Sequence, residues 1–79
     1  MKLIQYLLPK AKPAREAFAV RCGTTLGHIT NIAYGLKSCG PELAVNIERE
    51  SGGAVTRREL RPRDWARIWP EISDRDSAA

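Results

Sequence analysis

The chain has 79 residues and a net charge of +4. A chain of this length forms one small domain, which buries only about 60% of the surface of its unfolded form, so a homodimer is physically attractive. No apolar run approaches the ~20 residues that span a membrane. The apolar run from Leu3 to Leu8 is too short for a signal sequence. We therefore expect a cytoplasmic protein without a membrane partner.

The content of cysteine and histidine limits the possible chemistry. Cys22 and Cys39 are the two cysteines, and His28 is the single histidine, so the spacing of a zinc finger is excluded. A disulfide is one possibility for the cysteines, but Cys22 fits better as a small buried hydrophobe in a reduced protein. No nucleophile-and-base pair is recognisable. We therefore expect no enzymatic activity, no metal and no cofactor.

The positive charge is concentrated in the first half of the sequence. Residues 41–79 carry seven arginines and eight acids. A basic front half is expected for a surface that binds phosphates, although ordinary solubilising charge is the alternative. In residues 1–40 the only acidic residue is Glu16. The basic residues there are Lys2, Lys10, Lys12, Arg15, Arg21 and Lys37.

The apolar spacing predicts an all-α fold, a small bundle of about five short helices. A first helix is predicted over residues 1–8, where Pro9 ends it. A second helix is predicted over 13–22, with a proline in its first turn. The third is predicted over 25–34, with a threonine as its N-cap and Gly35 after its end.

The second half predicts one full helix and two shorter ones. Residues 41–50 form the full helix, and Thr56 to Glu59 fits a capping box that opens a helical turn to Leu60. A last helix is predicted over 62–69, ended by Pro70. Residues 73–79 are small and polar and are expected to form a disordered tail, so the domain is predicted to cover 1–72.

The stretch from Arg15 to Gly35 has the pattern of a DNA-binding helix-turn-helix. Gly23 lies where the chain must turn, and glycine adopts positive φ without a steric penalty. Small and apolar residues would meet on the inner surface of the two helices: Phe18, Ala19, Cys22, Ile29 and Ile32.

These residues carry a resemblance to a known family. The run Gly23-Thr24-Thr25-x-x-x-Ile29-x-x-Ile32-x-x-Gly35 resembles the motif of phage repressor and Cro proteins. Residues 48–62, and Asp64-Trp65 with Ile68-Trp69-Pro70, are similar to the end of YdaS-type, Cro-like prophage regulators. The resemblance covers roughly residues 3–72. It implies a transcriptional repressor that binds double-stranded DNA as a dimer.

The third helix would then be the recognition helix. Asn31 is the candidate for reading a base, because its amide can pair with adenine N6 and N7, although it could instead face solvent. Leu26 could contact a thymine methyl or pack inward, and Gly27 could allow close approach to DNA or simply weaken the first turn. The expected DNA-binding residues are Lys12, Arg15, Thr25, Leu26, Gly27, Thr30, Asn31, Tyr34 and Lys37.

The aromatic C-terminal segment bears on assembly. Trp65, Ile68 and Trp69 fall on one helical face and could anchor a dimer interface or pack on their own chain. A regulator that reads a palindromic operator needs two recognition helices about 34 Å apart. We therefore predict a homodimer on DNA, with either this C-terminal segment or the helix over 41–50 at the interface. Nothing beyond this domain remains to sense an effector, so no small-molecule ligand is expected.

Two other functions remain open from the sequence. YdaS-like proteins are often described as members of toxin–antitoxin pairs, and on that interpretation the chain acts mainly through a protein partner. A helical interaction module that has lost contact with DNA is the third interpretation. DNA binding by the purified protein separates the first interpretation from the other two.

Overall fold

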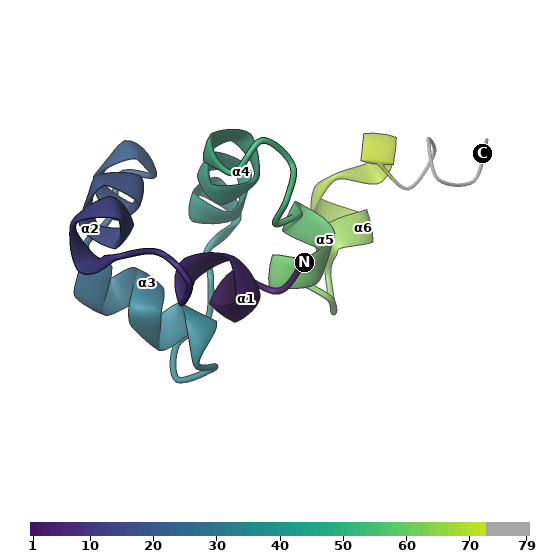
Figure 1. The fold of residues 1–79 in the computed structure, drawn as a ribbon. Coiled ribbons are helices and arrows are strands. Elements are labelled where there is room, and N and C mark those ends of the chain that lie inside the picture. The colour runs from purple at the N-terminus through teal and green to yellow at the C-terminus, as the bar shows by residue number, and fades with distance from the viewer. Residues whose placement is uncertain (73–79) are drawn as a thin grey trace.

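The computed structural model describes residues 1–72. Within that part the fold is all-α, without strands, as predicted (Figure 1). The predicted tail 73–79 lies outside the described residues. The labelled helices are α1 (Leu3–Leu7), α2 (Lys12–Arg21), α3 (Leu26–Ala33), α4 (Pro41–Glu50), α5 (Arg57–Leu60) and α6 (Trp65–Ile68).

Local signals placed several boundaries correctly. Helix α4 has the predicted bounds, and the capping box before α5 is confirmed. The Thr56 hydroxyl accepts a hydrogen bond from the Glu59 amide at 3.2 Å, and the Glu59 carboxylate accepts one from the Thr56 amide at 3.2 Å. Each side chain thus satisfies a backbone N–H group that would lack a partner at the start of the helix.

The helices at the two ends of the domain are shorter than predicted. Helix α1 covers Leu3–Leu7 rather than residues 1–8, and α6 covers Trp65–Ile68 rather than 62–69. A turn closed by Arg61 and Asp64 occupies the place of the first part of the predicted helix, with Arg61 Nη2 2.6 Å from Asp64 Oδ2. Pro70 limits α6 as predicted, because Trp69 before it has left the helical conformation at φ -127° and ψ 73°. A separate helical turn then begins at Pro70 and includes residues 70–72, since proline is tolerated in the first turn.

The turn of the helix-turn-helix has the predicted glycine geometry. Gly23 has φ +81°, and the Thr24 amide donates to the Ala19 carbonyl at 3.0 Å. Helix α3 ends in the same way: Gly35 has φ +78°, and the Leu36 amide donates a hydrogen bond to the Asn31 carbonyl. In both turns the glycine lets the chain reverse while the last carbonyls of the helix keep hydrogen-bond partners.

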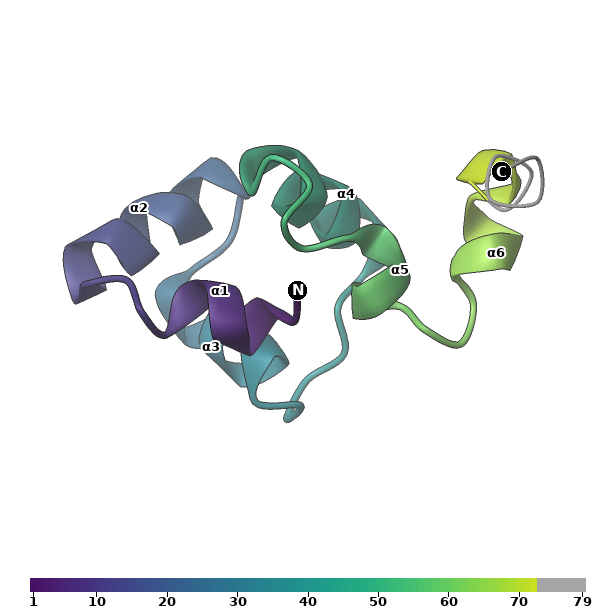
Figure 2. The same ribbon diagram turned by 45° about the vertical axis from the view of Figure 1, so that its right-hand side comes forward.

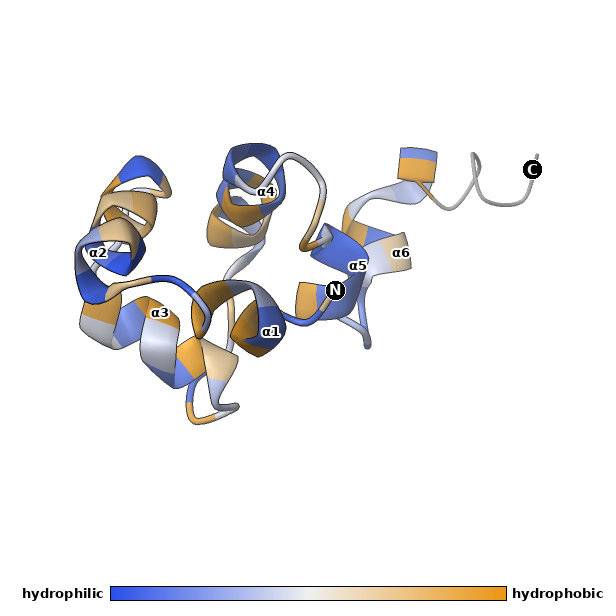
Figure 3. Cartoon of the chain, in the orientation of Figure 1, coloured by the Kyte–Doolittle hydropathy of each residue, from blue (hydrophilic) through white to orange (hydrophobic). Residues whose placement is uncertain are grey.

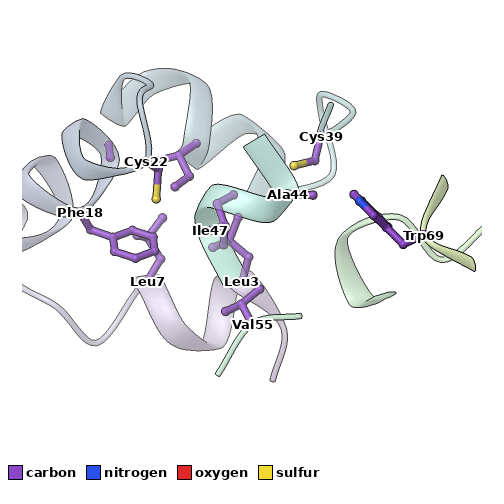
Figure 4. Packing of buried hydrophobic residues seen from close by; sticks show 11 residues of the cluster. Leu3, Leu7, Phe18, Cys22, Cys39, Ala44, Ile47, Val55 and Trp69 are labelled. Atoms are coloured by element: carbon purple, nitrogen blue, oxygen red, sulfur yellow. The ribbon is translucent and has the colours of Figure 1, made fainter. Parts of the chain in front are cut away.

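The predicted inner surface of the two helices is confirmed. Phe18, Ala19, Cys22 and Ile29 are buried, and Ile32 packs against them while remaining partly exposed. Figure 4 shows Phe18 and Leu7 near Cys22 at one end of the core, and Trp69 near Ala44 and Cys39 at the other. The core thus runs from the helix-turn-helix to the C-terminal segment.

Both cysteines are free thiols inside the core. Burial raises the pKa of Cys22 from 9.0 to about 11, and burial likewise raises the pKa of Cys39 from 9.0 to about 11. Loss of solvation disfavours the thiolate, so both side chains stay neutral near pH 7. This agrees with the prediction that Cys22 is a small core residue.

Asn46 on α4 makes a contact that the sequence analysis missed. Its Nδ2 donates to the carbonyl oxygen of Cys22 at 2.9 Å, at the end of α2. A carbonyl in the last turn of a helix has no partner within that helix. Asn46 therefore ties the helix-turn-helix to α4 by satisfying this group from another part of the chain.

We expect Asn46→Ala to lower the free energy of unfolding by about 1–2 kcal/mol, because the carbonyl loses its partner in a mostly buried place. Urea unfolding followed by circular dichroism measures the loss. The matched control is Asn31→Ala, which removes an exposed asparagine and should change stability by no more than about 0.5 kcal/mol. Equal stability of the two variants would show that the bond to Cys22 contributes nothing.

The C-terminal segment is held by arginines of α5. Arg57 lies over the Trp69 ring at 5.2 Å, and Arg58 lies over the Trp65 ring at 4.5 Å. Glu48 of α4 accepts a hydrogen bond from the Arg57 amide at 2.7 Å and lies 3.2 Å from Arg57 Nε. These contacts join α4, α5 and α6, and Trp69 is buried in its own chain. Of the two roles left open by the sequence, a dimer contact or packing on its own chain, Trp69 thus has the second.

Candidate nucleic-acid interface

Helix α3 lies along the lower edge of the molecule in Figure 1, packed against α2 and α1. Its start is capped by Thr25, whose hydroxyl accepts from the His28 amide at 3.2 Å. Ile29 is its fully buried residue. Because Ile29 fixes which side of the helix faces the core, it also fixes which side faces outward.

The outward side of α3 and its C-cap form a stripe of four exposed residues: Gly27, His28, Asn31 and the C-cap Tyr34. Their spacing places them on neighbouring turns of one face. We call this set the α3 stripe. His28 was not among the predicted DNA-binding residues, although its position three residues before Asn31 on a helix was a usable signal. The stripe presents an amide, an imidazole, a phenol and bare backbone.

Two predicted contact residues of α3 are less available than the stripe. Leu26 is partly buried and packs against the core. Of the two roles expected for it, contact with a thymine methyl or inward packing, the structure shows the second. Thr30 is also partly covered. Thr25 is exposed, but its hydroxyl already serves as the helix cap. The structure therefore concentrates the exposed polar groups at His28, Asn31 and Tyr34.

The stripe carries no acidic side chain, since α3 has the sequence LGHITNIA. Figure 3 shows this helix as mostly apolar or weakly polar, whereas α5 is strongly hydrophilic. A surface without carboxylates does not repel a phosphate backbone. The electrostatics of this face therefore depend on the basic residues around it.

Three of those basic residues were predicted to bind phosphates. Lys12 is exposed at the start of α2, where no side chain caps the helix. Arg15 is partly covered, and its Nε donates to the Lys10 carbonyl at 2.8 Å, which fixes the direction of the side chain. Lys37 is exposed in the loop after α3. Among residues 1–72 none of the three has an acidic partner.

Several arginines elsewhere contrast with these three. Arg49 pairs with Glu50 at 3.1 Å, Arg57 with Glu48 at 3.2 Å, and Arg61 with Asp64 at 2.6 Å. The carboxylates thus offset much of the charge near α4 and α5. Arg21 at the end of α2 also has an acidic partner, since its Nε lies 3.4 Å from Glu50. Lys12, Arg15 and Lys37 have no such partner among residues 1–72, so their charge stays available for an external anion.

Gly27 is not required by the fold of the chain. It has no positive φ, and a Cβ placed there would meet no atom within 4 Å. A glycine in a helix costs about 0.8–1.0 kcal/mol relative to alanine. Space inside this chain therefore does not explain the residue. Close approach of an external molecule and a weak first turn are the two interpretations that the sequence offered.

The predicted interface residues of the C-terminal segment do not join this surface. Figure 2 shows α6 on the far side of the molecule from α2 and α3, and Figure 1 shows the same separation. Trp65 and Ile68 are partly exposed, whereas Trp69 is only 9% exposed. Of the three, Trp65 and Ile68 therefore retain surface for another chain.

In residues 1–72 no group of His, Cys, Asp or Glu side chains could hold a metal ion. None of the helices in this region has the length and apolar character needed to cross a bilayer. Comparison with models of protein families and with curated proteins finds no match.

Proposed function

We propose that this protein is a sequence-specific regulator of transcription that binds double-stranded DNA through α3. The observation that carries the proposal is the exposed, acid-free α3 stripe on a helix-turn-helix, flanked by the unpaired Lys12 and Lys37. An α-helix fits the major groove of B-DNA, where each base pair presents its own pattern of donors and acceptors.

Each group has a role in this proposal. Asn31 reads an adenine through its amide, and Gly27 lets the backbone of α3 approach the DNA closely. Lys12, Arg15 and Lys37 bind phosphates, which positions the helix without specifying sequence. The uncapped start of α2 adds backbone N–H groups that favour an anion.

A homodimer on a palindromic operator is part of the proposal. Two copies of α3 would then occupy successive major grooves about 34 Å apart. A dimer that covers an operator overlapping a promoter excludes the polymerase, so repression by occlusion is the mechanism that we propose. Trp65 and Ile68 are the partly exposed apolar residues of α6 that we propose at the dimer contact.

The direct test is a salt-dependent anisotropy titration. The DNA is taken from immediately upstream of the protein's own gene, with a scrambled duplex as control. Asn31→Ala should weaken specific binding by about 1–3 kcal/mol and relax preference at one base pair. Arg15→Ala should weaken binding to both DNAs alike and lower the salt slope by about 1. If both variants bind like the parent, α3 is not the contact surface.

Gly27→Ala separates folding from DNA contact. The added methyl group points into open space. The free energy of unfolding should therefore stay the same or rise by up to about 1 kcal/mol. Operator affinity should fall, because the methyl group lies between the helix and the DNA. Thermal unfolding and the same anisotropy titration measure the two effects. Unchanged affinity would remove Gly27 from the contact surface.

A further inference from the structure

An open cleft of about 600 Å³ lies on the side of the domain formed by α1, the last turn of α3, the following loop and the segment from α5 to α6. This volume lies in the range of small-molecule sites. Residues far apart in the sequence supply its apolar surface: Leu3, Ile4, Ile32, Ala33 and Leu60.

The wall between the loop and α5 is held in place by Arg61. Its guanidinium donates to the Cys39 carbonyl and to both carboxylate oxygens of Asp64. The hydrogen bond from Arg61 keeps the pKa of Asp64 below its ordinary value, so this pair remains ionised near neutral pH. The cleft therefore has a side braced by hydrogen bonds.

The acids that line the cleft are already neutralised. Asp64 pairs with Arg61 at 2.6 Å, and Glu59 lies 3.0 Å from the amino group of Met1. They are the two carboxylates among the lining residues. A bound anion would therefore not meet a free negative charge.

The remaining cations of the cleft have no such partner. Lys2, Lys37 and Arg63 line it, and within the described chain none of them forms an ion pair. All three are exposed. The site thus combines an apolar floor with positive charge at its rim, and this combination is complementary to an amphipathic anion.

We propose that this cleft binds a small organic anion with an apolar body, such as an aromatic or aliphatic carboxylate or sulfonate. The apolar body packs on Ile4, Ile32 and Leu60, and the anionic group pairs with Lys37 and Arg63. No small-molecule ligand was expected from the sequence, because residues that are far apart in the chain form this cleft only after folding. Lys37 is also a proposed phosphate contact, so binding of the anion is measured in the absence of DNA.

The test uses 1-anilinonaphthalene-8-sulfonate, a fluorescent anion with an aromatic body, and the full chain without DNA. We expect saturable binding at one site and displacement of amide resonances of Ile32, Ala33 and Leu60 in two-dimensional NMR spectra. The neutral probe N-phenyl-1-naphthylamine, which lacks the sulfonate, should bind at least about fivefold more weakly, since it forgoes the charge contacts.

The decisive variant is Lys37→Gln with Arg63→Gln, which should weaken binding of the sulfonate by roughly fivefold, as expected for two partly exposed charge contacts. The matched control is Lys12→Gln with Arg67→Gln, which removes the same charge from exposed positions outside the cleft and should leave binding unchanged. Equal loss in both variants, equal binding of the neutral probe, or no saturable binding by the folded protein would overturn the proposal.

Discussion

Phe18→Ala is expected to lower the free energy of unfolding by about 3–5 kcal/mol, the usual cost of deleting a buried aromatic ring. The side chain has 0% exposure, and its ring centroid lies 5.2 Å from that of Tyr6, which joins α2 to α1. The total stability expected for 79 residues is about 4–12 kcal/mol. At the lower end of that range the loss removes nearly all of the stability, and at the upper end it removes about a quarter to two fifths of it.

Chemical denaturation followed by circular dichroism measures this loss. The matched control is Val20→Ala on the same helix, since Val20 is 73% exposed and its truncation should change stability by no more than about 0.5 kcal/mol. A similar effect for the two variants would contradict the placement of Phe18 in the core. A large effect for Val20 would instead indicate that this face of α2 is covered by another chain.

Trp69→Ala is the second change with a large expected effect, a loss of about 3 kcal/mol in the free energy of unfolding. Trp69 is 9% exposed within a single chain and lies beneath Arg57. The loss should therefore be the same at low and high protein concentration. A residue whose main partner is another chain behaves differently, because its contribution to stability depends on concentration.

Trp65→Ala provides the comparison, since Trp65 is partly exposed on the neighbouring turn. If α6 forms the dimer contact, this variant should shift the monomer–dimer equilibrium in analytical ultracentrifugation with little change in monomer stability. One outcome would contradict the intrachain role of Trp69. In that outcome the unfolding midpoint of the parent depends on protein concentration, whereas the unfolding midpoint of Trp69→Ala does not. Loss of dimer in neither variant would move the proposed interface away from α6.

The sequence by itself determined the helical class and the tight turn between α2 and α3. Gly23, Gly35 and the pair Thr56–Glu59 act within one or two turns of chain, so their effects were readable without any tertiary contact. The apolar spacing of Phe18, Ile29 and their neighbours placed one face of each helix in the core. Gly27, Asn31 and Tyr34 of the α3 stripe were then predicted because they lie on the side of the helix opposite this apolar face.

Only the tertiary structure decided the contacts between distant residues. Asn46 reaches the Cys22 carbonyl across 24 positions, and Trp69 is covered from α5 rather than left for a partner. The Arg61–Asp64 pair closed a turn where a helix had been predicted, and Arg61 also braces one wall of the cleft. These features depend on how the helices cross, and local propensity does not fix helix crossing because it is set by the packing of side chains from different elements.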